Sequence, residues 1–200
     1  MIAIIDYGMG NIHSVTKATQ LAGARDLRVT DKPQDILNAN KVILPGVGAF
    51  SDAMQGLRER GLVSPILESI KKGKYFLGIC LGMQLLFYQS QEADSVQGLS
   101  VLGGGVKRFT IKGFKVPHIG WNQLDFKSSK LLNSITPGAN VYFCHSYYVE
   151  PEDKDIIVAT TDYGIKFSSA INKDNIFGVQ FHPEKSQNTG LSILKNFVEL

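Results

Sequence analysis

The stretch Tyr75-Phe76-Leu77-Gly78-Ile79-Cys80-Leu81-Gly82-Met83-Gln84 decides how the chain folds. Its first five residues form an apolar run typical of a buried strand, and the pattern that follows predicts a helix over Leu81–Ser90. Glycines stand two residues before and two residues after Cys80, which is the spacing of a nucleophile elbow with cysteine in the serine position. A strand, an elbow and a helix in this order predict an α/β fold.

The elbow would give Cys80 the properties of a nucleophile. The turn between strand and helix is sharp, and Gly78 and Gly82 lack the Cβ atoms that would clash there. At a helix start, the helix dipole and the unpaired N–H groups favour a thiolate, and the N–H of Leu81 would face a developing oxyanion. The alternative interpretation, a buried structural cysteine, is common for an isolated cysteine and stays open at this point.

Short apolar runs alternate with helical patterns on the N-terminal side of the elbow. These runs predict strands at Ile2–Ile5, Leu27–Thr30 and Val42–Leu44. Between them, helices are predicted over Asn11–Ala24, after Asp31, from Ser51 to Gly61 and from Ser64 to Gly73, with Asp31 and Ser51 as N-caps. Strands separated by helices imply βαβ units and a parallel sheet.

From Leu99 onward, strands with short connections replace this alternation. The predicted strands are Val106–Ile111, Val141–His145, Ile156–Thr160, Ile165–Ile171 and Phe177–Phe181, with a hairpin turn at Lys173-Asp174-Asn175 and a closing helix at Leu191–Val198. The second half should therefore be more antiparallel. No linker or repeat divides the chain, so we expect a single domain over residues 1–200, a three-layer α/β/α arrangement with a mixed, mostly parallel central sheet.

Composition excludes several classes of protein. A chain of 200 residues can bury a core without disulfides and has room for one active site, while a net charge of +3 is too small to argue for nucleic acid. Cys80 and Cys144 are too few for a disulfide scaffold, and neither belongs to a CxxC pair. No apolar run approaches a membrane span, and Met1–Asp6 lacks the features of a signal peptide, so we expect a cytoplasmic protein.

A thiolate nucleophile needs a base, and the base needs a group that orients it. Among the four histidines, His182 is the best candidate, because it ends the apolar run Phe177–Phe181, and strand ends are where sites assemble in open α/β sheets. Glu184, two residues further on, could hold the imidazole tautomer. His13 lies in a helical pattern and is expected to be structural or at the surface, whereas His118 and His145 stay open as residues that could line a site.

The loop Leu44-Pro45-Gly46-Val47-Gly48-Ala49-Phe50 connects a strand end to a helix start. Such a loop can present backbone N–H groups to an anion. Its spacing fits neither the Walker A loop nor the dinucleotide fingerprint, so an oxyanion loop facing Cys80 is favoured over a phosphate site. A tight turn without a ligand remains the alternative for the loop taken alone.

Together these segments resemble the class I glutamine amidotransferases. Gly78–Gln84 and His182-Pro183-Glu184 match the two halves of that family's Cys-His-Glu pattern, in the same order. Within the family, the chain looks like the glutaminase subunits of imidazole glycerol phosphate synthases, on the strength of Asp6–Asn11, Pro45–Phe50, Val116–Asn122, Tyr142–Tyr147 and His182–Ser186. The resemblance runs from the first strand to the last helix and implies a flavodoxin-like glutaminase domain without a metal or cofactor.

The resemblance also implies roles for individual residues. Cys80 would attack the side-chain amide of glutamine, His182 would protonate the leaving ammonia and then activate water, and Glu184 would orient His182. The oxyanion would be stabilised by the backbone at Leu81, Val47 and Gly48. The glutamine-binding positions would be Gln84, Glu92, His145, Ser146 and Tyr147, and the partner-facing positions would be Asn11, Trp121, Tyr142 and Lys185. The family needs no side chain at the position of Cys144, which we expect to be a packed, unreactive thiol.

The last expectation concerns a partner subunit. The resemblance implies a heterodimer with a cyclase subunit, a (β/α)8 barrel that receives ammonia from the glutaminase and makes imidazole glycerol phosphate and an aminoimidazole carboxamide ribotide in histidine biosynthesis. The chain length agrees, because 200 residues leave no segment for an acceptor site. The alternatives are a glutaminase of another pathway, a cysteine or γ-glutamyl hydrolase of similar fold, and a catalytically silent interaction protein.

Overall fold

The computed structural model describes residues 1–200. Before Cys80, strands and helices alternate: β1 (Ile2–Ile5), α1 (Ile12–Leu21), β2 (Leu27–Thr30), α2 (Pro33–Asn38), β3 (Lys41–Leu44), α3 (Phe50–Glu59), α4 (Val63–Lys71) and β4 (Tyr75–Ile79). After it come α5 (Leu81–Gln84), β5 (Phe87–Ser90), β6 (Leu102–Arg108), β7 (His118–Gln123), β8 (Asp125–Phe126), β9 (Asn140–His145), β10 (Tyr147–Pro151), η1 (Lys154–Ile156), β11 (Ile157–Asp162), β12 (Lys166–Lys173), β13 (Ile176–Val179), η2 (Pro183–Lys185) and α6 (Gln187–Glu199). None of the helices combines the length and apolar composition that crossing a membrane requires.

The main sheet contains eleven strands, in the order β2-β1-β3-β4-β13-β12-β10-β6-β5, with β11 paired to β12 and β8 paired to β11. The strands β2, β1, β3, β4 and β13 run parallel to one another. This is the 2-1-3-4-5 order of flavodoxin-like folds, with β13 from the far end of the chain in the fifth place. Antiparallel pairs extend the sheet through β12, β10 and β6. The expected mixed sheet is therefore confirmed.

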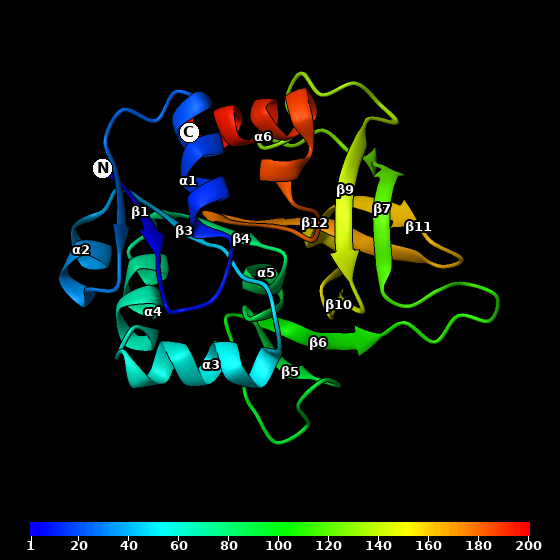
Figure 1. The fold of residues 1–200 in the computed structure, drawn as a ribbon, viewed down its shortest axis with the longest axis horizontal. Helices are drawn as coiled ribbons and strands as arrows, with labels where there is room; N and C mark the ends of the chain where they lie inside the picture. The colour runs from blue at the N-terminus through cyan, green and yellow to red at the C-terminus, as the bar shows by residue number, and fades with distance from the viewer.

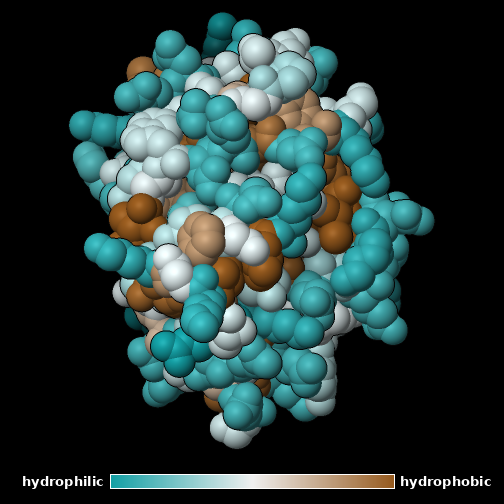
Figure 2. Space-filling view, turned by 90° about the vertical axis from the view of Figure 1, so that its right-hand side faces the viewer, coloured by the Kyte–Doolittle hydropathy of each residue, from teal (hydrophilic) through white to brown (hydrophobic).

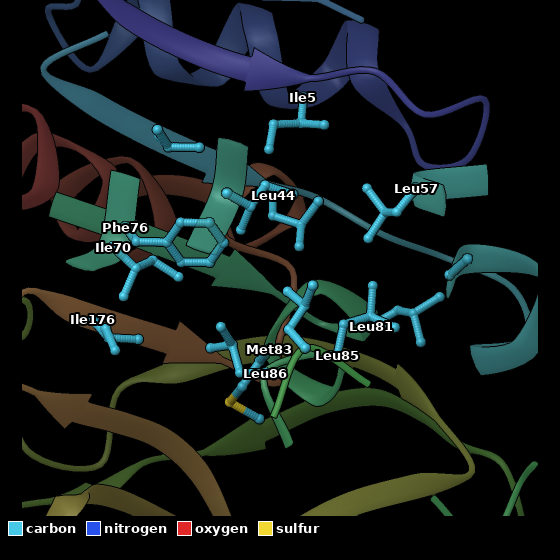
Figure 3. Close-up of a cluster of buried hydrophobic side chains, with 14 of the residues drawn as sticks. Ile5, Leu44, Leu57, Ile70, Phe76, Leu81, Met83, Leu85, Leu86 and Ile176 are labelled. Carbon is cyan, nitrogen blue, oxygen red and sulfur yellow. The ribbon is translucent and has the colours of Figure 1, made fainter. Parts of the chain in front are cut away.

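Two hydrophobic clusters cover opposite faces of the sheet, because successive side chains of a strand point to opposite sides. Ala3 and Ile5 of β1 pack with residues of α2, α3 and α4, whereas Ile2 and Ile4 pack with residues of α1 and α6. Figure 1 shows α1 and α6 above the sheet and α3 and α4 below it. In Figure 3, Leu81 and Leu85 project into the same cluster as Ile5, which anchors the segment after the elbow.

The parallel strands bring four distant motifs to one edge. Strand β4 lies between β3 and β13, and β3 pairs on its other side with β1. The segments that leave the carboxyl ends of these four strands are residues 6–11, residues 45–49, the elbow and residues 180–184. Each of them had been singled out from the sequence, and the strand order places them next to one another.

The predicted helix over Leu81–Ser90 is wrong beyond Gln84. The carbonyl of Leu86 accepts hydrogen bonds from Val101 and Leu102 instead of continuing a helical ladder, and the chain then enters β5. All side chains from Leu81 to Phe87 are buried. An apolar run that is buried on every side has no periodicity, so helix and strand cannot be distinguished from it.

Two predicted N-caps are also wrong. The N-cap of α2 is Lys32 and not Asp31, and the N-cap of α3 is Ala49 and not Ser51. At α3 the free N–H of Phe50 donates to Glu92 Oε2 at 3.0 Å, so a distant carboxylate replaces a local cap. The strands β7, β8 and β10 were not predicted, and β7 pairs with β9 in a separate two-stranded sheet.

A buried histidine pair joins β7 to β9. His118 and His145 lie opposite each other in the register, and their rings meet with a distance of 3.0 Å between His118 Nδ1 and His145 Nε2. Phe143 stacks on His118, and Phe109 and Phe167 pack around both rings. Burial lowers the pKa of His118 to about 4 and that of His145 to about 3, so both rings are neutral at pH 7.

Substitution of Gly82 by alanine should destabilise the fold. A Cβ atom at this position would lie 1.8 Å from the backbone carbonyl oxygen of Leu44, which cannot move without displacing β3. We expect a loss of about 3 kcal/mol in the free energy of unfolding, measured by denaturant titration. The control is Gly103→Ala, where the nearest atoms belong to the side chain of Glu152. Equal stability of the two variants would contradict this account of the elbow.

Acid should destabilise the protein through the histidine pair. The folded-state pKa values lie below the value of about 6.5 for an unfolded chain, so the unfolded state binds protons that the folded state rejects. The stabilisation contributed by the pair is therefore fully present above pH 6.5 and is lost as the pH falls towards 4. The pair should contribute about 2–4 kcal/mol to the difference between pH 7 and pH 5.

Unfolding titrations at several pH values check this expectation. The double variant His118→Gln and His145→Gln retains polar side chains that do not titrate, so its stability should depend less steeply on pH. His13→Gln, at an exposed position, should keep the slope of the unsubstituted protein. A double variant with an unchanged slope would assign the acid sensitivity to other groups.

Candidate active site

Cys80 stands in a strained elbow at the end of β4. Its backbone has a φ of 53° and a ψ of −109°, a conformation with positive φ that side chains other than glycine rarely adopt. The turn is tight, because a Cβ at Gly78 would meet the carbonyl oxygen of Gly82 at 2.6 Å. The predicted elbow is therefore present. However, α5 contains only four residues, so the support expected from a long helix dipole is small.

His182 connects Cys80 to Glu184. The distance from His182 Nδ1 to Glu184 Oε1 is 2.8 Å, and both side chains are almost fully buried. Burial alone lowers the pKa of His182, but its hydrogen bonds with Cys80 and Glu184 and the negative charges of both outweigh burial and raise the pKa to about 10. The imidazole is therefore a cation at neutral pH. Glu184 Oε2 is buried without a hydrogen-bond partner, so Oε1 carries the contact with His182.

The loop after β3 lies against the elbow. A Cβ at Gly46 would come within 3.0 Å of Leu81 Cβ and within 2.6 Å of the Tyr7 hydroxyl, so only glycine permits this approach. The Tyr7 hydroxyl donates to the carbonyl of Pro45 at 3.0 Å. Burial raises the pKa of Tyr7, and the charge of Cys80 makes a smaller contribution in the same direction. The N–H groups of Val47, Gly48 and Leu81 have no acceptor within the chain. These groups are available to an anion beside Cys80.

A cavity of about 300 Å³ opens at this edge of the sheet. Cys80 and His182 line it, whereas Glu184 lies behind His182. All predicted oxyanion and glutamine-binding residues also line it: Leu81, Val47, Gly48, Gln84, Glu92, His145, Ser146 and Tyr147. The structure therefore brings the residues singled out from the sequence into one cavity. Their roles remain predictions.

Two polar side chains of this cavity are held by the protein itself. Gln84 Nε2 donates to the carbonyl of Tyr147 and to Gln180 Oε1, both at 3.0 Å. Glu92 accepts from the N–H of Phe50, and burial raises the pKa of Glu92, with a smaller contribution from the charge of Asp52. Both side chains are thus fixed in place before a ligand binds.

Three of the four predicted partner-facing residues form one cluster. The rings of Trp121 and Tyr142 meet edge to face, with centroids 6.0 Å apart, and Lys185 Nζ lies 5.6 Å from the centre of the Tyr142 ring. Lys185 also lines the cavity. Asn11 lies outside this contact, at the start of α1, where its Oδ1 accepts from the N–H of Ser14 at 3.3 Å.

The face around β7 and β9 exposes large hydrophobic side chains. The exposed fractions are 58% for Ile119 and 48% for Trp121. Phe114, in the loop before β7, and Val47, beside the cavity, are also exposed. Figure 2, which views this end of the molecule, shows hydrophobic residues interspersed among hydrophilic ones. This face offers apolar area next to the cavity mouth.

The prediction that Cys144 is packed is wrong. Its side chain is exposed rather than packed, and the residue lines the same cavity as Cys80. Residues that alternate along β9 point to opposite sides, so the burial of Phe143 and His145 leaves Cys144 on the outer side. The alternation itself was the signal in the sequence that could have revealed this.

Sequence reasoning also missed Gln180 and Tyr7. Gln180 is completely buried, and its Nε2 lies 3.6 Å from Cys80 Sγ. Tyr7 anchors the loop after β3 through its hydroxyl. A glutamine inside the apolar run Phe177–Phe181 was the available signal for Gln180, because a buried polar side chain requires a partner. No such signal exists for Tyr7, whose partner is the backbone carbonyl of Pro45 in the loop after β3.

Several other cavities are larger, with volumes of about 350 to 760 Å³. The one of about 760 Å³ lies between β5, β6 and β10. Its lining is polar, with Asp94, Lys107 and Glu150 among the charged residues, and includes neither a cysteine nor a histidine. The nucleophile therefore identifies the smaller cavity as the candidate active site. No group of three or more histidine, cysteine, aspartate or glutamate residues is arranged to hold a metal ion.

Comparison with known proteins agrees with this geometry. The family model "Glutamine amidotransferase class-I" matches residues 3–200. The protein named "Imidazole glycerol phosphate synthase subunit HisH" from Moorella thermoacetica is 52% identical over 200 residues, which are 100% of this chain and 94% of the relative. The protein of the same name from Geobacter sulfurreducens is 52% identical over 206 residues, covering 100% of this chain and 98% of the relative.

A solved structure described as "Crystal structure of glutamine amidotransferase" superposes with a TM-score of 0.78, at 15% sequence identity, and covers 100% of both chains. At this identity the similarity shows the fold alone. The resemblance inferred from the motifs is confirmed by the family match, which spans nearly the whole chain. This chain therefore belongs to the class-I glutamine amidotransferase family.

Proposed function

We propose that this chain is the glutaminase subunit of an imidazole glycerol phosphate synthase, which hydrolyses glutamine to glutamate and ammonia for histidine biosynthesis. The proposal is supported by two relatives of that name at 52% identity over the whole chain. The observation that carries it is the buried contact from Cys80 through His182 to Glu184, at the edge of a 300 Å³ cavity.

The reaction begins with the thiolate of Cys80. Its Sγ attacks the side-chain amide carbon of glutamine and forms a tetrahedral intermediate whose oxygen carries the negative charge. The N–H groups of Leu81, Val47 and Gly48 stabilise this oxyanion. The His182 cation then gives its proton to the amide nitrogen, the carbon–nitrogen bond breaks, ammonia leaves and a thioester remains on Cys80.

Hydrolysis of the thioester restores the enzyme. Neutral His182 removes a proton from water, and the resulting hydroxide attacks the thioester carbon. The carbon–sulfur bond then breaks, which releases glutamate and returns the thiolate beside the His182 cation. Glu184, bonded to Nδ1, keeps the other ring nitrogen directed at Cys80 throughout.

The same cavity accommodates the rest of the substrate. The carboxylate of Glu92 binds the α-ammonium group of glutamine, while Gln84 and the backbone of His145, Ser146 and Tyr147 surround its chain. Burial of Glu92 is compatible with this role, because an ammonium group supplies the positive charge that the cavity lacks at that point. No cofactor enters any step.

The substrate that accepts the ammonia binds to a partner subunit. We propose that a cyclase subunit, a (β/α)8 barrel, binds over Trp121, Tyr142 and Lys185, with Asn11 at the margin, to form a heterodimer. The exposed apolar side chains beside the cavity mouth support this location. Ammonia released at Cys80 would then pass into the barrel without reaching bulk water.

Replacing Cys80 by alanine tests the proposed function. In the complex with the cyclase subunit, Cys80→Ala should lower glutamine-dependent synthesis by at least about three orders of magnitude, because no other group replaces the nucleophile. Synthesis with added ammonium salt should continue at the rate of the unsubstituted complex. Both rates are measured on the same preparation, with release of glutamate as a direct readout of the first step.

Cys144→Ser serves as the matched control, since Cys144 lines the same cavity but lies outside the Cys80–His182–Glu184 contact. This variant should keep most of the glutamine-dependent rate. Glutamine hydrolysis that persists in Cys80→Ala would exclude Cys80 as the nucleophile. Loss of the ammonium-dependent rate as well would contradict a role limited to supplying ammonia.

Replacing Trp121 by alanine tests the location of the partner. An aromatic anchor at the centre of an interface typically contributes more than about 1.4 kcal/mol, so the dissociation constant of the heterodimer should rise about tenfold or more. Isothermal titration of the two subunits measures this constant. Leu21→Ala, at an exposed position on α1, is the control and should leave it unchanged. An unchanged dissociation constant in Trp121→Ala would show that the interface lies elsewhere.

A further inference from the structure

We propose that Gln180 is a further catalytic residue, whose side-chain N–H group donates a hydrogen bond to Cys80 Sγ and thereby holds the nucleophile as a thiolate aimed at the substrate. This inference rests on the proposed function of Cys80. The contact is direct, with 3.6 Å between Gln180 Nε2 and Sγ. Gln180 is completely buried at the end of β13, and its backbone N–H is bonded to the Ser169 carbonyl.

The orientation of Gln180 follows from the carbonyl of Tyr147. A backbone carbonyl can only accept hydrogen bonds, so Gln84 must direct its NH2 group at Tyr147 O, 3.0 Å away. The same NH2 group lies 3.0 Å from the Gln180 side chain, which must therefore present its oxygen to Gln84. With Oε1 committed to Gln84, the NH2 group of Gln180 has to face the sulfur.

The histidine pair holds the Tyr147 carbonyl in place from the other side. His145 Nδ1 lies 2.8 Å from Tyr147 O and must donate, so its Nε2 accepts from His118 Nδ1. Because burial keeps both rings neutral, these tautomers persist across the neutral pH range. Tyr147 O thus accepts from His145 and Gln84 together, and the polarity of the amide pair is fixed by the fold.

Gln180 gives the Cys80 thiolate a stabilising interaction that the dipole of the short α5 does not provide. A helix of four residues offers little dipole to a thiolate. The side chains that hydrogen-bond to Cys80 are His182 and Gln180, and Tyr7 is close enough for the charge of Cys80 to raise its pKa. His182 stabilises the thiolate by charge, but it must give up its proton when ammonia leaves. Gln180 has no proton to transfer, so its hydrogen bond can persist through every step in which sulfur regains negative charge.

The same network restricts how Gln84 meets the substrate. Both hydrogens of its NH2 group are used, by Tyr147 O and by Gln180 Oε1, so only its own oxygen is free. Toward glutamine, Gln84 can therefore act only as an acceptor. It fits an N–H group of the substrate and not a carbonyl or carboxylate oxygen.

The test measures the alkylation of Cys80 by iodoacetamide as a function of pH in the full-length chain. Cys144→Ser is used as the background, because the exposed thiol of Cys144 would also react. Two variants are compared. Gln180→Leu removes both the donor and the acceptor, whereas Gln180→Glu keeps an oxygen for Gln84 and removes the donor to sulfur.

Both variants should shift the midpoint of the alkylation profile upward by about one pH unit, which is a tenfold change in the equilibrium. The kcat/KM for glutamine hydrolysis, measured with the cyclase subunit, should fall about tenfold or more, with the loss mainly in kcat. Gln34→Leu, at an exposed position on α2, is the control and should change neither quantity. Where Gln180→Leu does not fold, Gln180→Glu carries the test, because it preserves the partner of Gln84.

An alkylation midpoint that stays within about 0.2 pH units in a folded Gln180→Glu variant would overturn the inference. A lower melting temperature without that shift would likewise show Gln180 to be a packing residue only. Either result leaves the proposed function intact, because that function is judged separately by Cys80→Ala. Conversely, a shifted midpoint together with undiminished hydrolysis in Cys80→Ala would support the contact and reject the glutaminase mechanism.

Discussion

The contact between Gly82 and the carbonyl of Leu44 controls the geometry of the candidate active site. Because no Cβ separates them, the elbow after β4 lies directly against the end of β3, and the loop at Val47 and Gly48 is brought next to Cys80. The approach of Gly46 to Leu81 and to the Tyr7 hydroxyl tightens the same region. Backbone packing of this kind sets where the oxyanion donors stand relative to the sulfur.

A buried network of hydrogen bonds fixes the polar side chains of the site on this backbone. The Tyr147 carbonyl accepts from His145 and Gln84, and through Gln84 and Gln180 the network ends at Cys80 Sγ. Such a network is stable only when every donor finds an acceptor, since an unpaired buried polar group is costly. The histidines contribute as neutral rings, so this part of the site keeps its form across the neutral pH range, where His182 is a cation.

The local signals in the sequence were sufficient for much of the site. The glycines around Cys80, the His182-Pro183-Glu184 segment and the glycine-bearing loop after β3 are each short patterns with a clear physical reason, and the structure brings them to one cavity. The ends of the helices were harder to predict from the sequence. The end of α5 lies within an apolar run that is buried on all sides, and the start of α3 is capped by the distant carboxylate of Glu92, so neither leaves a local pattern.

The sequence alone determined the class of fold, the family and the residue types placed at the ends of the parallel strands, because these depend on neighbours within a few positions. Only the tertiary structure decided that Gln180 donates to Cys80, one hundred residues away, and that Cys144 faces outward. The direction of an amide group depends on which acceptors surround it. Here the decisive acceptor is a backbone carbonyl, which looks the same at every position of a sequence and acquires its role only when the strands assemble.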